Sequence, residues 1–176
     1  MIRRINFFGG PGSGKSTLAA YIYYCISKRG IHIELVGEYV KKWTFIDRIP
    51  TDFDQVKIFG EQLHNEDLIL RSGVPYIVTD SPLLMQVAYA KKNYFPAADS
   101  LENVVREFDK KYPCINIFLD RTDIPYQTKG RYENLENAII MDQKIEKEIV
   151  EFGYEYQKFR TVDDAKIIEF LLGKMV

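Results

Sequence analysis

The stretch FFGGPGSGKSTLA, residues 7–19, decides the fold of this 176-residue chain. Gly9 is followed by four residues and then by Gly14, Lys15 and Ser16, which matches the pattern G-x-x-x-x-G-K-[ST]. Closely spaced glycines let the backbone turn so that successive N–H groups point to one centre, and a following helix adds the positive end of its dipole. The stretch therefore predicts a phosphate-binding loop between a strand and a helix.

The positions of this loop have distinct predicted roles. Lys15 is expected to reach the β- and γ-phosphates of a nucleoside triphosphate, and the Ser16 hydroxyl is expected to ligate magnesium. The sequence thus predicts ATP and Mg²⁺ as cofactors, and a purely structural glycine turn is disfavoured because motif and context agree. The predicted nucleotide-binding residues are Gly10, Pro11, Gly12, Ser13, Gly14, Lys15, Ser16 and Thr17.

Short apolar runs alternate with longer helical patterns along the chain. Strand candidates begin at Ile5, Ile31, Val74, Cys114 and Tyr156, and amphipathic helical stripes run through 101–108 and 135–152. Such alternation implies βαβ units. The sequence predicts an α/β fold of three layers, α/β/α, with a five-stranded, mostly parallel sheet in one domain spanning residues 1–176.

Composition gives no overall sign of a nucleic-acid or membrane partner, although a local basic patch stays possible. The chain is 46% hydrophobic and 28% charged, with a formal net charge of -1, so no overall positive field favours nucleic acid or an anionic membrane. The start MIRRINFFGG has too short an apolar run for a signal peptide, and no segment is long enough to span a membrane. We expect a cytoplasmic protein, and a homodimer is an open possibility that no sequence feature tests.

Two acidic residues follow predicted strands, where ligands bind in parallel sheets. Glu38 comes after the second strand and can orient an acceptor hydroxyl and take its proton; the alternative is a solvated acid at a helix start. Asp80 comes after the third strand and can hold magnesium through water or orient the acceptor; the alternative is a cap for the helix after Pro82. The predicted metal residues are Ser16 and Asp80.

The loop after the fourth strand carries three cations, Arg121, Lys129 and Arg131. Arginines that close over a transferring phosphoryl group stabilise its charge. We therefore expect a short lid at about residues 121–134, with Arg121 and Arg131 as catalytic cations beside Lys15, Glu38 and Asp80. A solvated charged loop is the alternative.

Together, GGPGSGKSTLA, VGEYVKKW, TDSP and FLDRTDIPYQTKGRYE resemble the P-loop nucleoside and nucleotide kinase superfamily. The likeness is strongest to kinases of the ribosylnicotinamide-kinase type and extends to the thymidylate-kinase type. It implies an ATP-dependent phosphotransferase with its donor residues at Lys15 and Ser16, its acceptor-side acids at Glu38 and Asp80, and a lid containing Arg121 and Arg131. The sequence departs from the thymidylate and deoxynucleoside kinases after the third strand, where DSP stands without the acid–arginine pair.

The acceptor stays open at this level. Aromatic residues Tyr39, Trp43 and Phe45 follow Glu38 and can stack a base or simply pack in the core. The first reading is a kinase of a small nucleoside or nucleotide. The second is a kinase of a hydroxyl carried by DNA or RNA, such as a hydroxymethylated base, and the third is a non-enzymatic nucleotide-binding module. Lys41, Lys42 and Arg48 favour a phosphorylated acceptor if they face the pocket, and a neutral nucleoside if they face water.

Overall fold

The computed structural model of the chain describes residues 3–51, 53–121, 125–126 and 132–175. Its sheet has five strands, all parallel, in the order β2-β3-β1-β4-β5. All five predicted strands are therefore confirmed, and three of them are shorter than the predicted segments. Their bounds are β1 Arg4–Phe8, β2 Ile33–Val36, β3 Tyr76–Thr79, β4 Cys114–Asp120 and β5 Gln157–Arg160.

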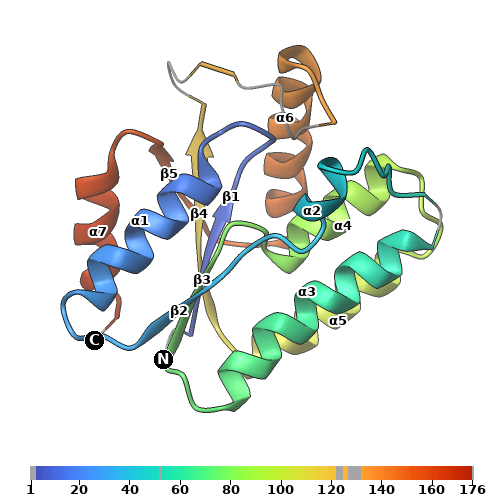
Figure 1. Ribbon diagram of the computed structural model, residues 1–176. Coiled ribbons are helices and arrows are strands. Elements are labelled where there is room, and N and C mark those ends of the chain that lie inside the picture. The colour runs from blue at the N-terminus through green and yellow to red at the C-terminus, as the bar shows by residue number, and fades with distance from the viewer. Residues whose placement is uncertain (1–2, 52, 122–124, 127–131, 176) are drawn as a thin grey trace.

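Helices connect the strands and cover both faces of the sheet (Figure 1). Helix α6 begins where the side chain of Asn134 accepts a hydrogen bond from the Asn137 N–H at 2.8 Å, and ends at Gly153 in the left-handed conformation. The bounds are α1 Lys15–Ser27, α2 Lys41–Thr44, α3 Asp54–Arg71, α4 Leu83–Lys92, α5 Ala98–Lys111, α6 Leu135–Phe152 and α7 Asp164–Leu172. The short helix α2 was not predicted, because four residues give no measurable periodicity.

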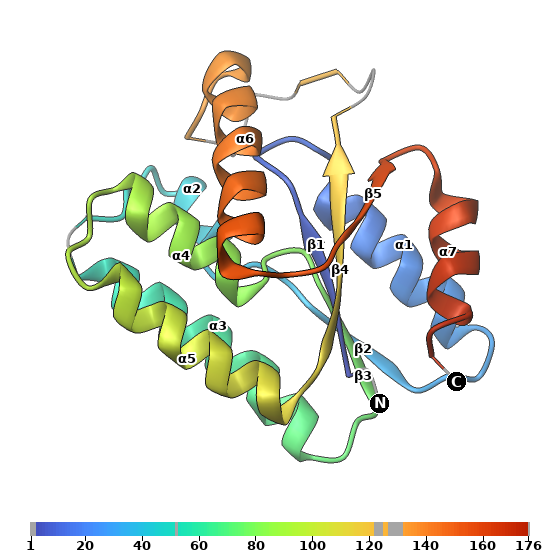
Figure 2. The same ribbon diagram turned by 180° about the vertical axis from the view of Figure 1, so that it is seen from behind.

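The layers divide the core into two apolar clusters. One face of the sheet packs against α1 and α7, and the other against α3, α4, α5 and α6 (Figures 1 and 2). Neighbouring residues of β1 point to opposite clusters, since Phe7 lies in the first and Phe8 in the second. The predicted three-layer α/β/α fold is confirmed.

Strand β1 determines where the functional residues lie. All five of its residues are buried, as expected for a central parallel strand covered on both faces, and it pairs with β3 and β4. Because all strands run in one direction, the segments after β1, β2, β3 and β4 emerge at the same edge of the sheet. Glu38, Asp80 and Arg121 therefore meet the phosphate-binding loop there.

In the described part of the chain, no helix combines the length and apolar character needed to cross a bilayer.

Candidate active site

The phosphate-binding loop lies between β1 and α1, and bonds within the protein hold its turn. Gly12 and Gly14 have φ of 78° and 84°, a left-handed conformation that glycine adopts without steric cost. The backbone N–H and the hydroxyl of Ser13 donate to the Gly10 carbonyl at 3.3 and 3.0 Å. From the β5–α7 connection, the Thr161 hydroxyl donates to the Ser13 carbonyl at 2.7 Å. The loop is thus anchored both from within and by a segment far along the chain.

Lys15 folds across this loop. Its Nζ donates to the carbonyls of Gly9 at 2.6 Å and Gly10 at 2.8 Å. Burial lowers the pKa of Lys15, while the nearby carboxylates of Glu38 and Asp80 oppose that shift. An anionic phosphate at the loop would restore the electrostatic stabilisation that burial removes from the ammonium group.

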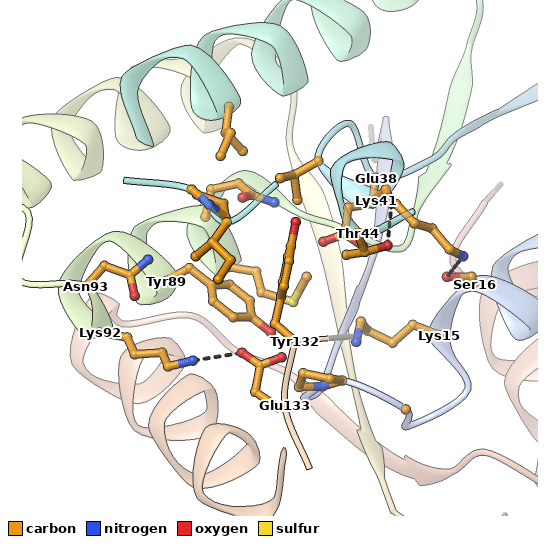
Figure 3. A pocket seen from close by; sticks show the side chains of 18 of the residues that line it. Lys15, Ser16, Glu38, Lys41, Thr44, Tyr89, Lys92, Asn93, Tyr132 and Glu133 are labelled. Carbon is orange, nitrogen blue, oxygen red and sulfur yellow. Dashed lines mark hydrogen bonds and ion pairs between the residues drawn. The ribbon is translucent and has the colours of Figure 1, made fainter. Parts of the chain in front are cut away.

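A cavity of about 440 Å³ opens beside the loop (Figure 3). Its size falls within the range of small-molecule sites. One wall is the loop itself and the start of α1, and the opposite wall comes from α3, α4 and the segment before α6. The lining includes Lys15, Ser16, Glu38, Lys41, Phe45, Ile49, Gln55, Gln86, Tyr89, Lys92, Asn93, Tyr132 and Glu133.

Glu38 lies in this cavity, two residues beyond the end of β2. Burial is the main cause that raises the pKa of Glu38, and the neighbouring Asp80 raises it further, while Lys15 and Lys41 lower it. A carboxylate with a raised pKa is a better proton acceptor than an ordinary surface glutamate. The structure therefore brings the predicted acceptor-side acid and the phosphate loop to one cavity.

Asp80 lies one residue beyond β3 and is only 5% exposed. Its Oδ1 has no hydrogen-bond partner among the described residues. It does not cap the following helix, because α4 has Pro82 at its N-cap position and no side-chain cap. This oxygen is free to accept a hydrogen bond, and a magnesium-bound water or an acceptor hydroxyl would suit it.

The three predicted cations near Glu38 lie in different environments, and Lys42 is exposed. Lys41 is directed to the start of helix α1, where its Nζ donates a hydrogen bond to the Ser16 hydroxyl at 3.3 Å (Figure 3). Arg48 pairs with Asp54 at 3.0 Å and stacks on the Trp43 ring at 3.7 Å from its centroid. Trp43 itself is buried, so this ring packs in the protein and does not offer a stacking face to a base. Of the predicted aromatic residues, Phe45 lines the cavity.

Arg121 lies against the phosphate-binding loop. Its Nη2 donates to the Pro11 carbonyl at 2.8 Å, and its Nε to Asp142 Oδ2 at 2.9 Å. The other predicted lid arginine, Arg131, and Lys129 lie outside the described residues. The structure does not show the predicted arginine lid, and Arg121 is here bound to the loop.

Several residues of the site were missed at the sequence level. Lys92 at the end of α4 pairs with Glu133 at 2.7 Å (Figure 3). The hydroxyl of Tyr132, which lines the cavity, donates to the Arg48 carbonyl. These contacts join segments 41 and 84 residues apart, so no local pattern indicates them. Asp142 could have been found, because it falls four residues after Ala138 on the apolar face of α6, where a carboxylate needs an explanation.

Several solved structures have a fold similar to that of this chain. A structure described as NadR protein in complex with NAD and AMP-PNP has a TM-score of 0.69 and 16% identity, over 96% of this chain and 48% of that one. A second NadR structure, in complex with NR, has a TM-score of 0.66 and 16% identity, over 89% of this chain and 44% of that one. This chain thus spans less than half of either NadR chain.

A full-length match gives the same fold. Deoxyadenosine kinase from M. mycoides, with the products dCMP and a flexible dCDP bound, has a TM-score of 0.61 and 17% identity, over 98% of both chains. The fold is therefore that of the P-loop nucleoside kinases, as the resemblance of the motifs implied. Among curated proteins, no sequence match is found. A family model described as an AAA domain matches residues 4–163, and the chain therefore belongs to this AAA domain family.

Proposed function

We propose that the protein is an ATP-dependent kinase that transfers the γ-phosphoryl group to a hydroxyl of a small nucleoside-type acceptor. The observation that carries this proposal is one cavity of about 440 Å³ that is lined by Lys15, Ser16 and Glu38 together, with Glu38 close enough to Lys15 to influence its pKa. A nucleotide-binding module without transfer chemistry would need the loop but not an acid facing it. The bound nucleotides and products in the similar structures support the same class of reaction.

The donor side would be formed by the loop and by two magnesium-binding groups. The N–H groups of the first turn of α1 have no acceptor within the helix and can donate hydrogen bonds to phosphate oxygens. The Ser16 hydroxyl at the cavity and Oδ1 of Asp80, which no described residue hydrogen-bonds, fit a magnesium site of hydroxyl and water-mediated carboxylate ligands. When bound, magnesium would neutralise charge on the phosphate oxygens.

On the acceptor side, Glu38 would orient the hydroxyl and accept its proton as the new phosphate ester forms. The lowered pKa of Lys15 does not remove its charge from this scheme, because phosphate anions favour the protonated ammonium. Arg121 and Arg131 remain proposed cations of the transfer step. Arg121 already lies at the loop through its bond to the Pro11 carbonyl.

The charges of the cavity favour an acceptor without phosphate. Lys41 is directed to Ser16, and Arg48 is engaged by Asp54 and Trp43. Lys92 is paired with Glu133. Arg48 and Lys92 are therefore paired with carboxylates, and Lys41, whose partner is a neutral hydroxyl, is directed to the side of the proposed phosphate donor. We propose a nucleoside ahead of a nucleoside monophosphate.

The rim of the cavity also bears on the nucleic-acid alternative. Phe45 and Ile49 line the cavity and are 66 and 69% exposed. A surface that follows a nucleic-acid backbone is instead rich in lysine and arginine. This rim favours a small acceptor with an apolar or aromatic part over a hydroxyl carried by a polymer.

A labelling experiment tests the proposal. The protein is incubated with γ-labelled ATP and magnesium against nucleosides, nucleoside monophosphates and DNA containing hydroxymethylated bases. We expect label in a nucleoside and none with Lys15→Ala, which should keep its fold because the residue lies at the cavity and not in the core. Label confined to DNA would establish the polymer alternative, and equal transfer by Lys15→Ala would exclude the proposed mechanism. ATP binding without transfer to any acceptor would favour the non-enzymatic module.

A further inference from the structure

We propose that Asp142 of helix α6 is a positioning residue that joins Arg121 to the phosphate-binding loop and holds the loop in the shape that binds triphosphate. The inference rests on the proposed function for the identity of the ligand, ATP. It concerns a residue outside the loop motif, at a distance of 132 positions from Gly10 in the sequence.

Both oxygens of the Asp142 carboxylate are used. Oδ1 accepts a hydrogen bond from the Gly10 N–H, and Oδ2 accepts one from Arg121 Nε at 2.9 Å. The side chains of Asp142 and Arg121 are only 16 and 15% exposed. Charge-assisted hydrogen bonds in such partly desolvated places are stronger than surface ion pairs. One carboxylate therefore links the first part of the loop to the arginine after β4.

Arg121 completes the connection from its other end. Its Nη2 donates to the carbonyl of Pro11, the residue after Gly10. Gly10, Asp142, Arg121 and Pro11 thus form a closed ring of contacts, which we call the loop brace. Two neighbouring residues of the loop are fixed by it, one through its N–H and one through its carbonyl.

The packing around Gly10 shows how closely the loop and α6 approach each other. A Cβ atom at Gly10 would lie 2.6 Å from the carbonyl oxygen of Ala138 and 2.6 Å from Asp142 Oδ1. Only a residue without a side chain permits this approach. The close approach of the loop to α6 at Gly10 places the Asp142 carboxylate against the loop.

The brace also balances charge beside Lys15. Arg121 lowers the pKa of Lys15 and Asp142 raises it. Without the carboxylate, two cations would remain beside the loop with one fewer anion between them. Removing Asp142 should therefore loosen the Gly10–Pro11 turn and release Arg121 from its place.

The test compares binding of magnesium–ATP, measured by titration calorimetry, in Asp142→Ala, Asp142→Asn, Arg121→Ala and the double alanine variant. We expect Asp142→Ala to weaken binding about tenfold or more, the scale of a lost charge-assisted hydrogen bond. The double variant should bind magnesium–ATP with about the affinity of whichever single alanine variant binds less tightly, since both substitutions break the same brace. Asp142→Asn keeps an oxygen for the Gly10 N–H and should recover part of the affinity.

A matched control lies one turn further along the same helix. Glu146 is also a partly buried carboxylate of α6, but it binds Tyr156 and Lys158 and not the loop. Glu146→Ala should leave ATP affinity unchanged. Thermal unfolding of all variants separates a loss of binding from a loss of folded protein.

The outcomes are separable from those of the proposed function. If the parent protein binds ATP but phosphorylates no acceptor, the kinase proposal fails while the binding comparison still tests the brace. Parent-like ATP affinity in Asp142→Ala, or additive effects in the double variant, would overturn the brace. Absence of ATP binding by the parent protein would overturn both.

Discussion

The buried Glu66 should make the stability of the protein fall as pH rises through neutrality. This carboxyl group is on α3 and fully buried, 3.5 Å from Nη1 of the buried Arg4. Arg4 also pairs with Asp109, so it has a second counter-ion. Gln62 donates to Glu66 Oε1 at 3.4 Å, whereas Oε2 has no hydrogen-bond partner among the described residues. The perturbation we choose is Glu66→Gln, which keeps the shape and removes the titration.

The magnitude follows from the pKa of this group. Burial is the main cause that raises the pKa of Glu66 from 4.5 to about 7, against the opposing effect of Arg4. The folded protein then keeps a proton that the unfolded chain has lost, so the contribution of Glu66 to stability is fully present below pH 4.5 and is lost as pH rises through about 7. The gap between these pKa values corresponds to about 3 kcal/mol, at roughly 1.4 kcal/mol for each tenfold step in proton affinity.

Urea unfolding at a series of pH values measures this effect. The free energy of unfolding of the parent protein minus that of Glu66→Gln should decrease by about 3 kcal/mol between roughly pH 4.5 and 8. Glu107→Gln is the control, because Glu107 on α5 is 72% exposed and, among the residues that the structure describes, pairs only with Lys110. A difference that does not change with pH would refute the reasoning, since it would mean that Arg4 keeps Glu66 ionised at its ordinary pKa.

Three further substitutions test the site. Glu38→Gln should lower kcat by at least about a hundredfold. It should also remove the fall in rate at acidic pH, which in the parent protein should lie above the ordinary glutamate range because the pKa of Glu38 is raised. An unchanged dependence of rate on pH would assign the base to another residue. Tyr132→Phe loses the bond to the Arg48 carbonyl and should raise KM for the acceptor more than KM for ATP, whereas equal changes would contradict a role at the cavity mouth. Gly10→Ala should destabilise the protein by about 1–3 kcal/mol, because its Cβ meets the backbone of α6. Gly60→Ala, with open space around it, is the control, and a similar loss there would contradict the steric argument.

Periodicity and turn residues were sufficient to predict most of the fold. The run of apolar residues in β1 followed by glycines, and the stripes that became α5 and α6, are local patterns that act within a few residues. The places of Glu38 and Asp80 in the fold also followed from local position, because each comes after a parallel strand and all such strand ends meet at one edge. The pairing of partners across the site could not be predicted in this way.

By itself, the sequence determined the phosphate-binding loop, the five parallel strands and the two acids that follow them, since each depends on short-range spacing and on strand direction. Only the tertiary structure decided what the charged side chains do. It turned Arg48 to Trp43 and Asp54, Lys41 to Ser16, and Arg121 to Pro11 and Asp142. The physical reason is that a long charged side chain reaches several partners, and the choice between them depends on which segments the folded sheet brings within hydrogen-bond distance.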